Sequence, residues 1–252
     1  MSEPTQGRFV WDEVMSSNPE EVEPFYANLF GWRIDAREMG GIGTYRMLIQ
    51  GEKPLGGILP LMGPPGVPSH WISYITTEDV DATCAMVTRL GGRVLREPMD
   101  IDSVGRFAIC ADPEGAVFAP FRSSESEAPS GERPPAGTFC WHELMVEDPD
   151  GAIGFYSELF GWRFEKMPMP GSSYWVGGHE GVQACGLMRR PPEVPVSHWL
   201  GYVSVESAEA SLAKALTLGA QPLVGVTPIP RMGRFAVLAD PCGAALGLFE
   251  LA

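Results

Sequence analysis

The sequence predicts an α+β protein of two tandem domains, each made of two βαβββ modules. Three observations support this prediction: an internal repeat that spans nearly the whole chain, a linker-like composition between its copies, and strand and helix signals that recur in one order. The chain has 252 residues, of which 44% are hydrophobic. It is therefore long and apolar enough for a packed core in each domain.

The repeat is an ordered series of matching segments. The first two matching pairs of segments are separated by 130 positions in the chain, and the last two by 128. Between these segments, Tyr45 matches Tyr174 and Gly57 matches Gly186, each at a separation of 129 positions. A loss of two residues between conserved blocks is expected if strands are kept and loops are trimmed. The matching pairs are FVWDEVM (9–15) with FCWHELM (139–145), FYANLFGWR (25–33) with FYSELFGWR (155–163), SHWISY (69–74) with SHWLGY (197–202), and GRFAICADPEGA (105–116) with GRFAVLADPCGA (233–244).

The repeat and the composition together set the domain boundaries. Residues 122–138 are rich in Ser, Pro, Gly and Glu and nearly free of large apolar side chains, which indicates a flexible linker. We therefore expect a first domain at 1–121 and a second at 139–252.

Each copy shows the same order of elements. In the first copy, an alternating strand (9–15) precedes a helix with Asn18 as N-cap, Pro19 at its first position and Gly31 at its end. Short strands bounded by Gly or charged turns follow, and the order then repeats around a second helix opened by Asp79. The expected strands of the first copy are 9–15, 31–38, 43–50, 54–61, 69–76, 92–101, 104–112 and 115–122.

Composition excludes several classes of partner and location. The net charge is −14 and both copies are acidic, so nucleic acid and anionic membrane surfaces are improbable partners. No apolar stretch is long enough for a membrane helix and the first residues lack a secretory signal, which predicts a cytoplasmic protein. Five cysteines without CxxC spacing indicate free thiols. A fused pair of domains is compatible with either a monomer or a homodimer.

The motifs of each copy resemble those of the vicinal oxygen chelate superfamily, which includes glyoxalases, bleomycin-resistance proteins and extradiol dioxygenases. The resemblance rests on FY-x-x-LFGW at a helix end, DVDA before the second helix, and GRFA-x-x-x-DP-x-G before the last strand, and it covers nearly the whole chain twice. Two-domain glyoxalase-like proteins are the most similar type. The resemblance implies that paired βαβββ modules curl their sheets into a cup. A divalent metal often lies in that cup, on ligands from the first, fourth, fifth and eighth strands.

At the ligand positions that the resemblance implies, this chain carries few donor atoms. The first-strand position falls on Trp11 and Trp141, and the fourth strand of the second copy offers only Gln183 and Cys185. A divalent ion needs three or more converging N, O or S donors, so we predict no metal and no cofactor. A register error of one residue would instead put Asp12 or His142 at the first-strand position. The remaining positions fall on Ile72 and Leu200 (fifth strand) and on Ala119 and Gly247 (eighth strand).

Strand alternation defines the main candidate site residues. Trp11, Glu13 and Met15 share one strand face, and Trp141, Glu143 and Met145 share the equivalent face. If the Trp residues point into the cup, the two glutamates are carboxylates in an apolar cavity, where they could act as a general base or accept a ligand's hydrogen bond. The alternative is a rim carboxylate paired with Arg106 or Arg234.

Further candidates each have a structural alternative. Tyr74 and Tyr202 could donate to a ligand or simply pack in the sheet. The guanidinium groups of Arg106 and Arg234 could neutralise a ligand's charge or anchor a local acid, and His70 and His198 could bind a ligand or hydrogen-bond at a strand end. The aspartates of the DP-x-G segments (Asp112, Asp240) are interpreted as turn residues, and Trp32 and Trp162 as cover for the helix–sheet seam.

Three functions are compatible with these residues. The first is a metal-free protein that sequesters a flat, partly aromatic small molecule, such as an antibiotic or metabolite, in cups lined by Trp and Met. The second is a metal-independent isomerase, lyase or hydrolase of a carbonyl compound, with Glu13 or Glu143 as base. The third is a metal-dependent glyoxalase-like lyase or dioxygenase. The sequence does not decide between enzyme and binder.

Overall fold

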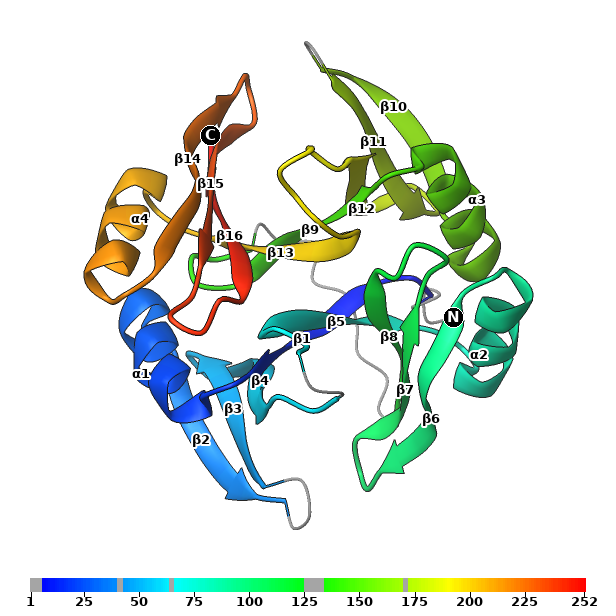
Figure 1. Cartoon of the computed structure of the whole chain (residues 1–252), viewed down its shortest axis with the longest axis horizontal. Helices are drawn as coiled ribbons and strands as arrows, with labels where there is room; N and C mark the ends of the chain where they lie inside the picture. Colours follow the sequence, from blue (N-terminus) through cyan, green and yellow to red (C-terminus); the bar gives the residue numbers. More distant parts are fainter. Residues whose placement is uncertain (1–5, 40–42, 64–65, 125–133, 170–171) are drawn as a thin grey trace. The chain divides into compact units, whose positions relative to one another are not determined.

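The structure, a computed structural model, describes residues 6–39, 43–63, 66–124, 134–169 and 172–252. Residues 1–5 of the expected N-terminal segment and 125–133 of the expected linker lie outside the described residues. Each copy of the repeat contains βαβββ twice, as predicted, and the α+β class is confirmed (Figure 1). No helix in the described part of the chain is long and apolar enough to cross a membrane.

The first copy forms one mixed eight-stranded sheet with the strand order β2-β3-β4-β1-β5-β8-β7-β6. In it β1 pairs with β4 and β5 with β8 in parallel, while the outer strands pair antiparallel. Its elements are β1 (Phe9–Ser16), α1 (Pro19–Phe30), β2 (Arg33–Glu38), β3 (Thr44–Gln50), β4 (Lys53–Pro60), β5 (His70–Thr76), α2 (Val80–Arg89), β6 (Arg93–Ile101), β7 (Gly105–Ala111) and β8 (Val117–Ser123).

The second copy repeats this sheet with the order β10-β11-β12-β9-β13-β16-β15-β14. Its elements are β9 (Phe139–Val146), α3 (Pro149–Phe160), β10 (Arg163–Met169), β11 (Ser172–His179), β12 (Val182–Arg189), β13 (His198–Ser204), α4 (Ala208–Thr217), β14 (Gln221–Ile229), β15 (Gly233–Ala239) and β16 (Ala245–Leu251).

The ends of the first helix follow the predicted signals with one difference. Pro19 occupies the first helical turn, and Gly31 ends the helix in the left-handed conformation at φ 75°. Asn18 stands at the N-cap position, but its side chain does not cap a backbone N–H. Its amide Nδ2 donates instead to Glu21 Oε2 at 3.1 Å. Asn18 is therefore the N-cap residue, as predicted, although its side chain binds the nearby carboxylate and not the helix backbone.

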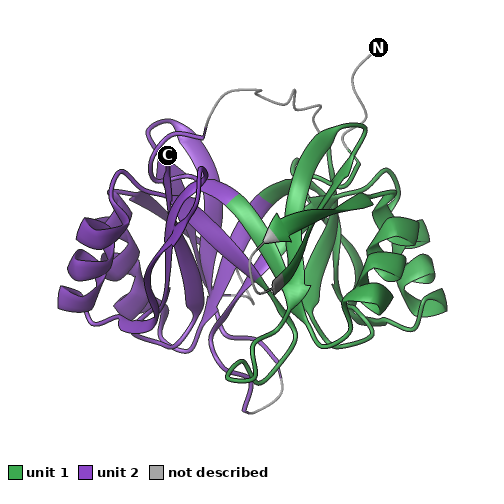
Figure 2. Ribbon diagram, turned by 90° about the horizontal axis from the view of Figure 1, so that it is seen from above, with its two compact units in different colours: residues 1–10, 73–132, 141–199 green, residues 11–72, 133–140, 200–252 purple. Residues whose placement is uncertain are grey.

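The chain packs as two compact units that do not follow the order of the copies (Figure 2). Unit 1 combines residues 1–10 and 73–132 with 141–199, so it holds part of β5, β6–β8, most of β9 and β10–β12. Unit 2 combines residues 11–72 with 133–140 and 200–252. Each hydrophobic core accordingly draws side chains from both copies, with α2 against α3 in unit 1 and α1 against α4 in unit 2.

A buried hydrogen-bonded network ties the modules together inside each unit. In unit 2 the fully buried Tyr26 hydroxyl donates to Asp240 Oδ2 at 2.8 Å and accepts from Trp71 Nε1 at 3.2 Å. Asp240 Oδ1 accepts the backbone N–H groups of Cys242 and Ala244, both at 2.9 Å, which confirms the turn interpretation of DP-x-G. The same aspartate thus closes its own turn and receives a tyrosine from the other copy.

Unit 1 repeats the network with Tyr156. Its hydroxyl donates to Asp112 Oδ2 at 3.2 Å and accepts from Trp199 Nε1 at 3.0 Å. Trp162 and its counterpart Trp32 are also buried, as predicted for the helix–sheet seam. Their indole N–H groups donate to the carbonyls of Gly7 and Gly137, respectively. Every polar atom of these aromatic side chains therefore has a partner, which is what burial requires.

The buried Asp240 predicts a definite dependence of stability on pH. Burial raises the pKa of Asp240, and the hydrogen bonds from Tyr26 and the turn oppose this rise only in part. Between the unfolded and the folded pKa the folded protein binds the proton more tightly, so the free energy of unfolding falls as the pH rises through that interval from about 4. We expect Asp240→Asn, whose amide can donate to Tyr26, to flatten this part of the curve. Urea unfolding across this pH range tests it, and parallel curves for variant and wild type would contradict it.

Candidate functional site

A hydrogen-bonded trio of Trp11, Glu13 and Tyr45 lies on the face of β1 and β3 that is turned away from α1. Tyr45 Oη donates to Glu13 Oε1 at 2.7 Å, and Trp11 Nε1 lies 3.1 Å from Tyr45 Oη and 3.2 Å from Glu13 Oε1. Glu13 is buried at 6% exposure, whereas Trp11 and Tyr45 are only half-buried. The carboxylate therefore holds two aromatic side chains whose rings remain partly accessible.

The second copy repeats the trio with Trp141, Glu143 and Tyr174. Trp141 Nε1 donates to Tyr174 Oη at 2.9 Å, and Tyr174 is hydrogen-bonded to the buried Glu143. The first trio lies within unit 2 and the second within unit 1, so each is complete inside one compact unit. Because both copies keep it, the trio is a local property of the βαβββ module.

A glycine on the fourth strand of the module makes room for each tyrosine. Gly57 pairs with Glu13, and a Cβ atom added at Gly57 would lie 2.3 Å from Tyr45 Oη. Gly186 pairs with Glu143, and a Cβ atom there would lie 1.8 Å from Tyr174 Oη and 2.9 Å from Trp141 Nε1. Any side chain at these positions would displace the tyrosine, so the glycines are part of the site.

The tyrosine hydroxyls stay protonated and act as donors. Burial, together with the charge of Glu13, raises the pKa of Tyr45 well above its ordinary value, although the hydrogen bond from Trp11 opposes the shift. The same causes, with Glu143 as the charge, raise the pKa of Tyr174. A phenol that is a poor acid beside a buried carboxylate is a hydrogen-bond donor that fixes the carboxylate's position.

The two methionines predicted for the site lie on the same faces as the trios. Met15 is 5% exposed and pairs with Leu59, while Met145 is 8% exposed and pairs with Met188. The structure therefore places Met15 and Met145 beside the glutamates as buried apolar support. Their flexible thioethers are suited to adapt to different contacts.

Tyr74 and Tyr202 lie in aromatic clusters on β5 and β13. The ring of Tyr74 is 5.8 Å from that of Phe107 and 6.1 Å from that of Phe121, and Tyr202 has the equivalent neighbours Phe235 and Phe249. Both tyrosines are buried, at 6% and 4% exposure. Both tyrosines therefore pack within the sheet, which is one of the two alternatives considered for them.

Arg106 and Arg234 lie on the opposite face of their strands from these aromatic rings. Arg106 forms ion pairs with Asp81 on α2 at 2.7 Å and with Asp100 on β6 at 3.0 Å. Arg234 pairs with Glu209 on α4 at 2.5 Å. The alternative in which these guanidinium groups pair with Glu13 and Glu143 was therefore wrong, because local acids on the helix side bind them, as the local-acid alternative predicted. A ligand contact of the two arginines stays a prediction.

His70 and His198 form local backbone contacts at the starts of their strands. His70 Nδ1 lies 2.8 Å from the carbonyl oxygen of Pro68, and His198 Nδ1 lies 3.0 Å from that of Val196. Burial lowers the pKa of His198, although the carbonyl contact opposes the shift, and this favours the neutral ring. These contacts match the strand-end alternative considered for both histidines.

The first-, fifth- and eighth-strand positions, where the resemblance implies metal ligands, hold side chains without metal-binding donors. Trp11 and Trp141 use their indole N–H groups within the trios. At the eighth-strand position of the second copy, Gly247 pairs with Tyr202, whose ring occupies the space of a Cβ atom there. Among the described residues, no three His, Cys, Asp or Glu side chains lie close enough together to hold a metal ion.

The alternative register that would make His142 a ligand is wrong. His142 is buried and its ring stacks on Phe9 at 3.9 Å between centroids, on the face opposite to Trp141 and Glu143. Asp12 alternates in the same way with Trp11 and Glu13 and is 3% exposed. The strand therefore presents Trp and Glu, and not Asp12 or His142, on the candidate face.

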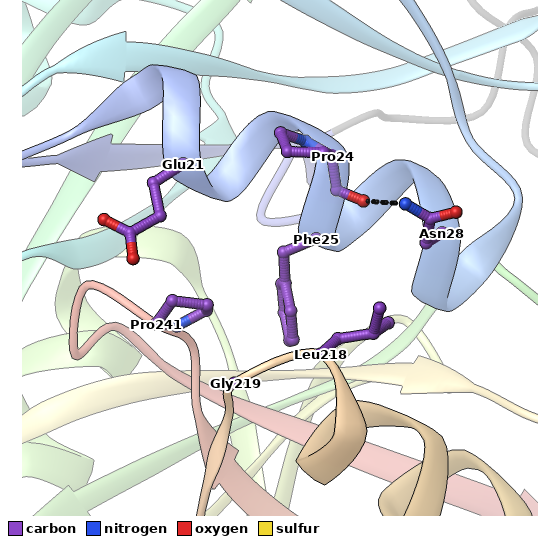
Figure 3. Close-up of a pocket in the computed structure, with 7 residues that line it drawn as sticks. All are labelled: Glu21, Pro24, Phe25, Asn28, Leu218, Gly219 and Pro241. Carbon is purple, nitrogen blue, oxygen red and sulfur yellow. Dashed lines mark hydrogen bonds between the residues drawn. The ribbon is translucent and has the colours of Figure 1, made fainter.

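A surface pocket of about 260 Å³ lies away from the trios in unit 2, between α1, the end of α4 and the turn at Pro241 (Figure 3). None of the predicted site residues lines this pocket. Its walls are formed by Glu21, Pro24, Phe25, Asn28, Leu218, Gly219 and Pro241.

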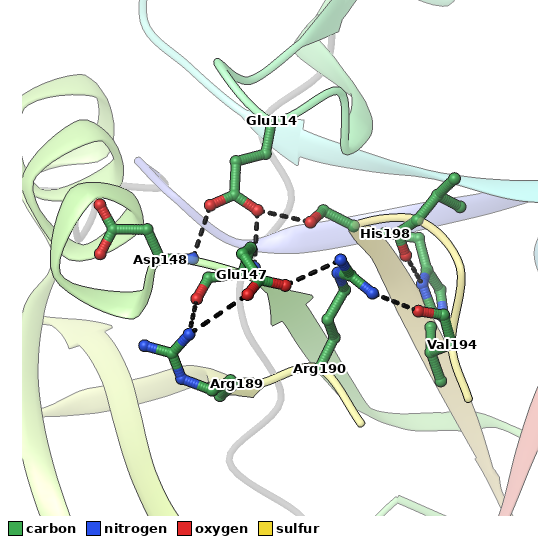
Figure 4. Close-up of polar contacts among 9 residues, drawn as sticks. Glu114, Glu147, Asp148, Arg189, Arg190, Val194 and His198 are labelled. Carbon is green, nitrogen blue, oxygen red and sulfur yellow. Dashed lines mark hydrogen bonds and ion pairs between the residues drawn. The ribbon is translucent and has the colours of Figure 1, made fainter. Parts of the chain in front are cut away.

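In unit 1 the carboxylate of Glu114 anchors the start of α3 (Figure 4). It accepts the backbone N–H groups of Glu147 and Asp148, both at 2.7 Å, and the hydroxyl of Ser197 at 2.5 Å. Burial raises the pKa of Glu114, but these hydrogen bonds outweigh it and leave the pKa below its ordinary value. The second copy has Cys242 in this place, so this anchor belongs to one unit.

The comparisons with known proteins agree with this fold. The family model described as the glyoxalase/bleomycin resistance protein/dioxygenase superfamily matches residues 8–119, and a glyoxalase-like domain matches residues 141–249. The putative glyoxylase CFP32 of Mycobacterium tuberculosis is 34% identical over 99% of this chain and 97% of its own length. The chain belongs to the glyoxalase/bleomycin resistance protein/dioxygenase superfamily.

Two further proteins are similar to this superfamily member. The anthracycline biosynthesis protein DauV of a Streptomyces species is 29% identical over 97% of this chain and 94% of its own length. The crystal structure of the 2,3-dioxygenase LapB from Pseudomonas sp. KL28 aligns with a TM-score of 0.66 at 15% identity, covering 98% of this chain and 93% of LapB. At that identity the alignment confirms the vicinal oxygen chelate fold alone.

Sequence reasoning missed the tyrosine of each trio. Tyr45 and Tyr174, and with them Gly57 and Gly186, had a signal in the repeat, because both pairs recur at one offset. When a tyrosine on one strand and a glycine on the next strand both recur in the repeat, the tyrosine ring is expected to lie over the glycine, which has no side chain. The recurrence of these two pairs therefore carried a signal for the position of each tyrosine, although it was used only to align the two copies.

Proposed function

We propose that this superfamily member binds a flat, partly aromatic small molecule on the faces of its sheets that carry the two trios, without a metal ion, and so sequesters it. The observation that supports this proposal is the trio itself. A Trp stands at the first-strand ligand position of each copy. Tyr45 and Glu13 bind the indole N–H of Trp11, and Tyr174 binds that of Trp141. A fixed, partly accessible aromatic ring is a stacking surface with little conformational entropy left to lose.

The relatives suggest a class of compound for the first test. Two of them are anthracycline biosynthesis proteins, from Streptomyces sp. C5 and Streptomyces peucetius. Anthracyclines are flat and partly aromatic, which matches the class of ligand proposed from the Trp and Met side chains. An anthracycline is therefore the probe of choice, and a protein that shows no binding to any of a panel of flat aromatic compounds would contradict the proposal.

Trp141 and Trp175 form a matched pair for this test. Both are half-buried on strands of the second copy, but Trp175 packs on the helix side, where Lys166 lies 5.4 Å from its ring centre. We expect Trp11→Ala combined with Trp141→Ala to weaken anthracycline binding at least about tenfold, since stacking anchors dominate such sites. Trp175→Ala should leave the affinity unchanged. Fluorescence titration with and without a chelator measures both, and equal losses in all variants would point to a general structural effect.

Arg106 provides a second check on which face binds the ligand. Because its guanidinium group is engaged by Asp81 and Asp100 on the helix side, Arg106→Gln should leave the affinity for the same probe unchanged. A clear loss of affinity in this variant would mean that the ligand contacts the opposite face of the sheet.

A second candidate function rests on the contact between Tyr45 and Glu13. A carboxylate that accepts a phenol's hydrogen bond at 2.7 Å is arranged like an acid–base pair, which would suit a metal-independent isomerase, lyase or hydrolase of a carbonyl compound. Glu13→Gln combined with Glu143→Gln separates the two functions. Turnover that survives both changes would exclude the glutamates as bases, whereas loss of turnover with binding retained would favour the enzyme.

Metal analysis addresses the third candidate, a metal-dependent glyoxalase-like lyase or dioxygenase. The measurement is the metal content of the full chain purified without a chelator. Less than about 0.1 divalent ion per chain is expected, because the first-, fifth- and eighth-strand ligand positions carry no donor side chains. A stoichiometric divalent ion would overturn the metal-free proposal.

A further inference from the structure

Two thiols of unit 1 lie in contact where the second helix meets the sheet. Cys84 on α2 and Cys110 on β7 place their sulfur atoms 3.8 Å apart, and both cysteines are free. Both belong to the hydrophobic core of that unit, where α2 packs on β7. This contact was not anticipated from the sequence, because 25 residues separate the two positions in the chain.

The other copy shows that the fold does not require thiols at this place. The positions equivalent to Cys84 and Cys110 are Leu212 and Leu238, and both leucines pack in the core of unit 2. An apolar contact is therefore sufficient for packing. Packing alone therefore does not explain the two cysteines, whose thiols can be oxidised.

The two thiols differ in access and acidity. Cys84 is 6% exposed, whereas Cys110 has no exposed surface. The hydrogen bond from the Cys110 thiol lowers the pKa of Cys84, although burial opposes the shift, while the same contact and burial raise the pKa of Cys110. The thiolate is the nucleophilic form, so Cys84 is the thiol that reacts first and Cys110 is placed to react second.

We propose that Cys84 and Cys110 are a redox pair that a hydroperoxide converts to a disulfide, fastening α2 to β7. The Cys84 thiolate attacks the terminal OH oxygen of the peroxide, the O–O bond breaks, and Cys84 becomes a sulfenic acid. The leaving alkoxide or hydroxide takes up the proton that the Cys84 thiol released and departs as an alcohol or water. The Cys110 sulfur then attacks the Cys84 sulfur, the S–S bond forms, the S–O bond breaks and water leaves. The peroxide is reduced by two electrons and the two thiols are oxidised by two.

The closure needs only a local movement. The sulfur atoms must approach by roughly 1.8 Å to reach the length of a disulfide bond. Of the two cysteines only Cys84 has any exposed surface, so an oxidant reaches the pair through Cys84. A small shift of α2 on the sheet therefore brings the sulfurs together and admits the oxidant at Cys84.

The experiment treats the reduced full-length protein with a small excess of hydrogen peroxide and then alkylates the remaining thiols. We expect a mass loss of about 2 Da in a sample taken before alkylation, and a linked Cys84–Cys110 peptide after it, both absent when dithiothreitol is added first. The oxidised protein should also unfold at a higher temperature than the reduced protein, since the link closes a loop. Oxidation found only at Cys140, Cys185 or Cys242, with Cys84 and Cys110 both alkylated after unfolding, would overturn the proposal.

Leucine variants separate the role of Cys84, which reacts first with the peroxide, from that of Cys110, which reacts second. Leucine also preserves the packing seen in the other copy. Cys110→Leu should stop at the Cys84 sulfenic acid, which dimedone traps, and Cys84→Leu should leave Cys110 unmodified. Cys140→Ser is the control and should still form the link. If either leucine variant shows the mass loss of the wild type, the disulfide involves other cysteines and the proposal fails.

Discussion

Gly186→Ala is expected to break the trio of the second copy and to weaken ligand binding about tenfold or more at that site. The added methyl group would lie 1.8 Å from Tyr174 Oη and 2.9 Å from Trp141 Nε1, so the tyrosine must leave its place. Overpacking of this kind costs about 1–3 kcal/mol of stability. Without its tyrosine partner, the Trp141 indole also loses the hydrogen bond that fixes it.

The measurement is ligand affinity in a chain whose other site carries Trp11→Ala. Gly225→Ala is the matched control, because this glycine also lies in a strand and a Cβ atom there would meet nothing within 4 Å. Gly57→Ala should have the same effect in the first copy, where the clash is with Tyr45 Oη at 2.3 Å. Full affinity in Gly186→Ala would show that the trio does not position the ligand.

Tyr156→Phe is expected to lower the free energy of unfolding by about 2–4 kcal/mol, although it removes only one oxygen atom. That oxygen donates to Asp112 and accepts from Trp199, and all three side chains are buried. The variant leaves a buried carboxylate oxygen and a buried indole N–H short of a partner. Tyr26→Phe should cost a similar amount in unit 2, through Asp240 and Trp71.

Denaturant unfolding with a double-mutant cycle measures this effect. Trp199→Phe removes the indole N–H, so combining it with Tyr156→Phe should cost less than the sum of the single changes. Additive costs would mean that the two side chains do not share the hydroxyl. An unchanged free energy of unfolding in Tyr156→Phe would contradict the network altogether.

The networks also explain why the compact units take one module from each copy. Asp240 lies in a turn of the second copy, yet its partner Tyr26 belongs to a helix of the first, 214 positions earlier. Trp32 and Trp162 reinforce the arrangement, since each donates to a carbonyl in the segment that leads into the other copy. Separating the copies would expose both cores, so we expect neither copy to be stable when it is expressed alone.

The repeat, the order of the elements and the strand bounds of the first copy to within about two residues follow from the sequence alone. These are local properties, because alternation, helical spacing, Pro19 and Gly31 act within a few residues of the chain. The sequence also determined that Trp11, Glu13 and Met15 share a face. The side of the strand on which a residue lies depends only on its parity.

Only the tertiary structure decided which side chains meet. It joined Tyr45 to Glu13, brought Cys84 to Cys110, and turned Arg106 toward Asp81 and away from the candidate face. Contacts of this kind depend on strand order, on register and on the packing of helices against the sheet. Those are set by burial summed over the whole chain, and no short stretch of sequence records them.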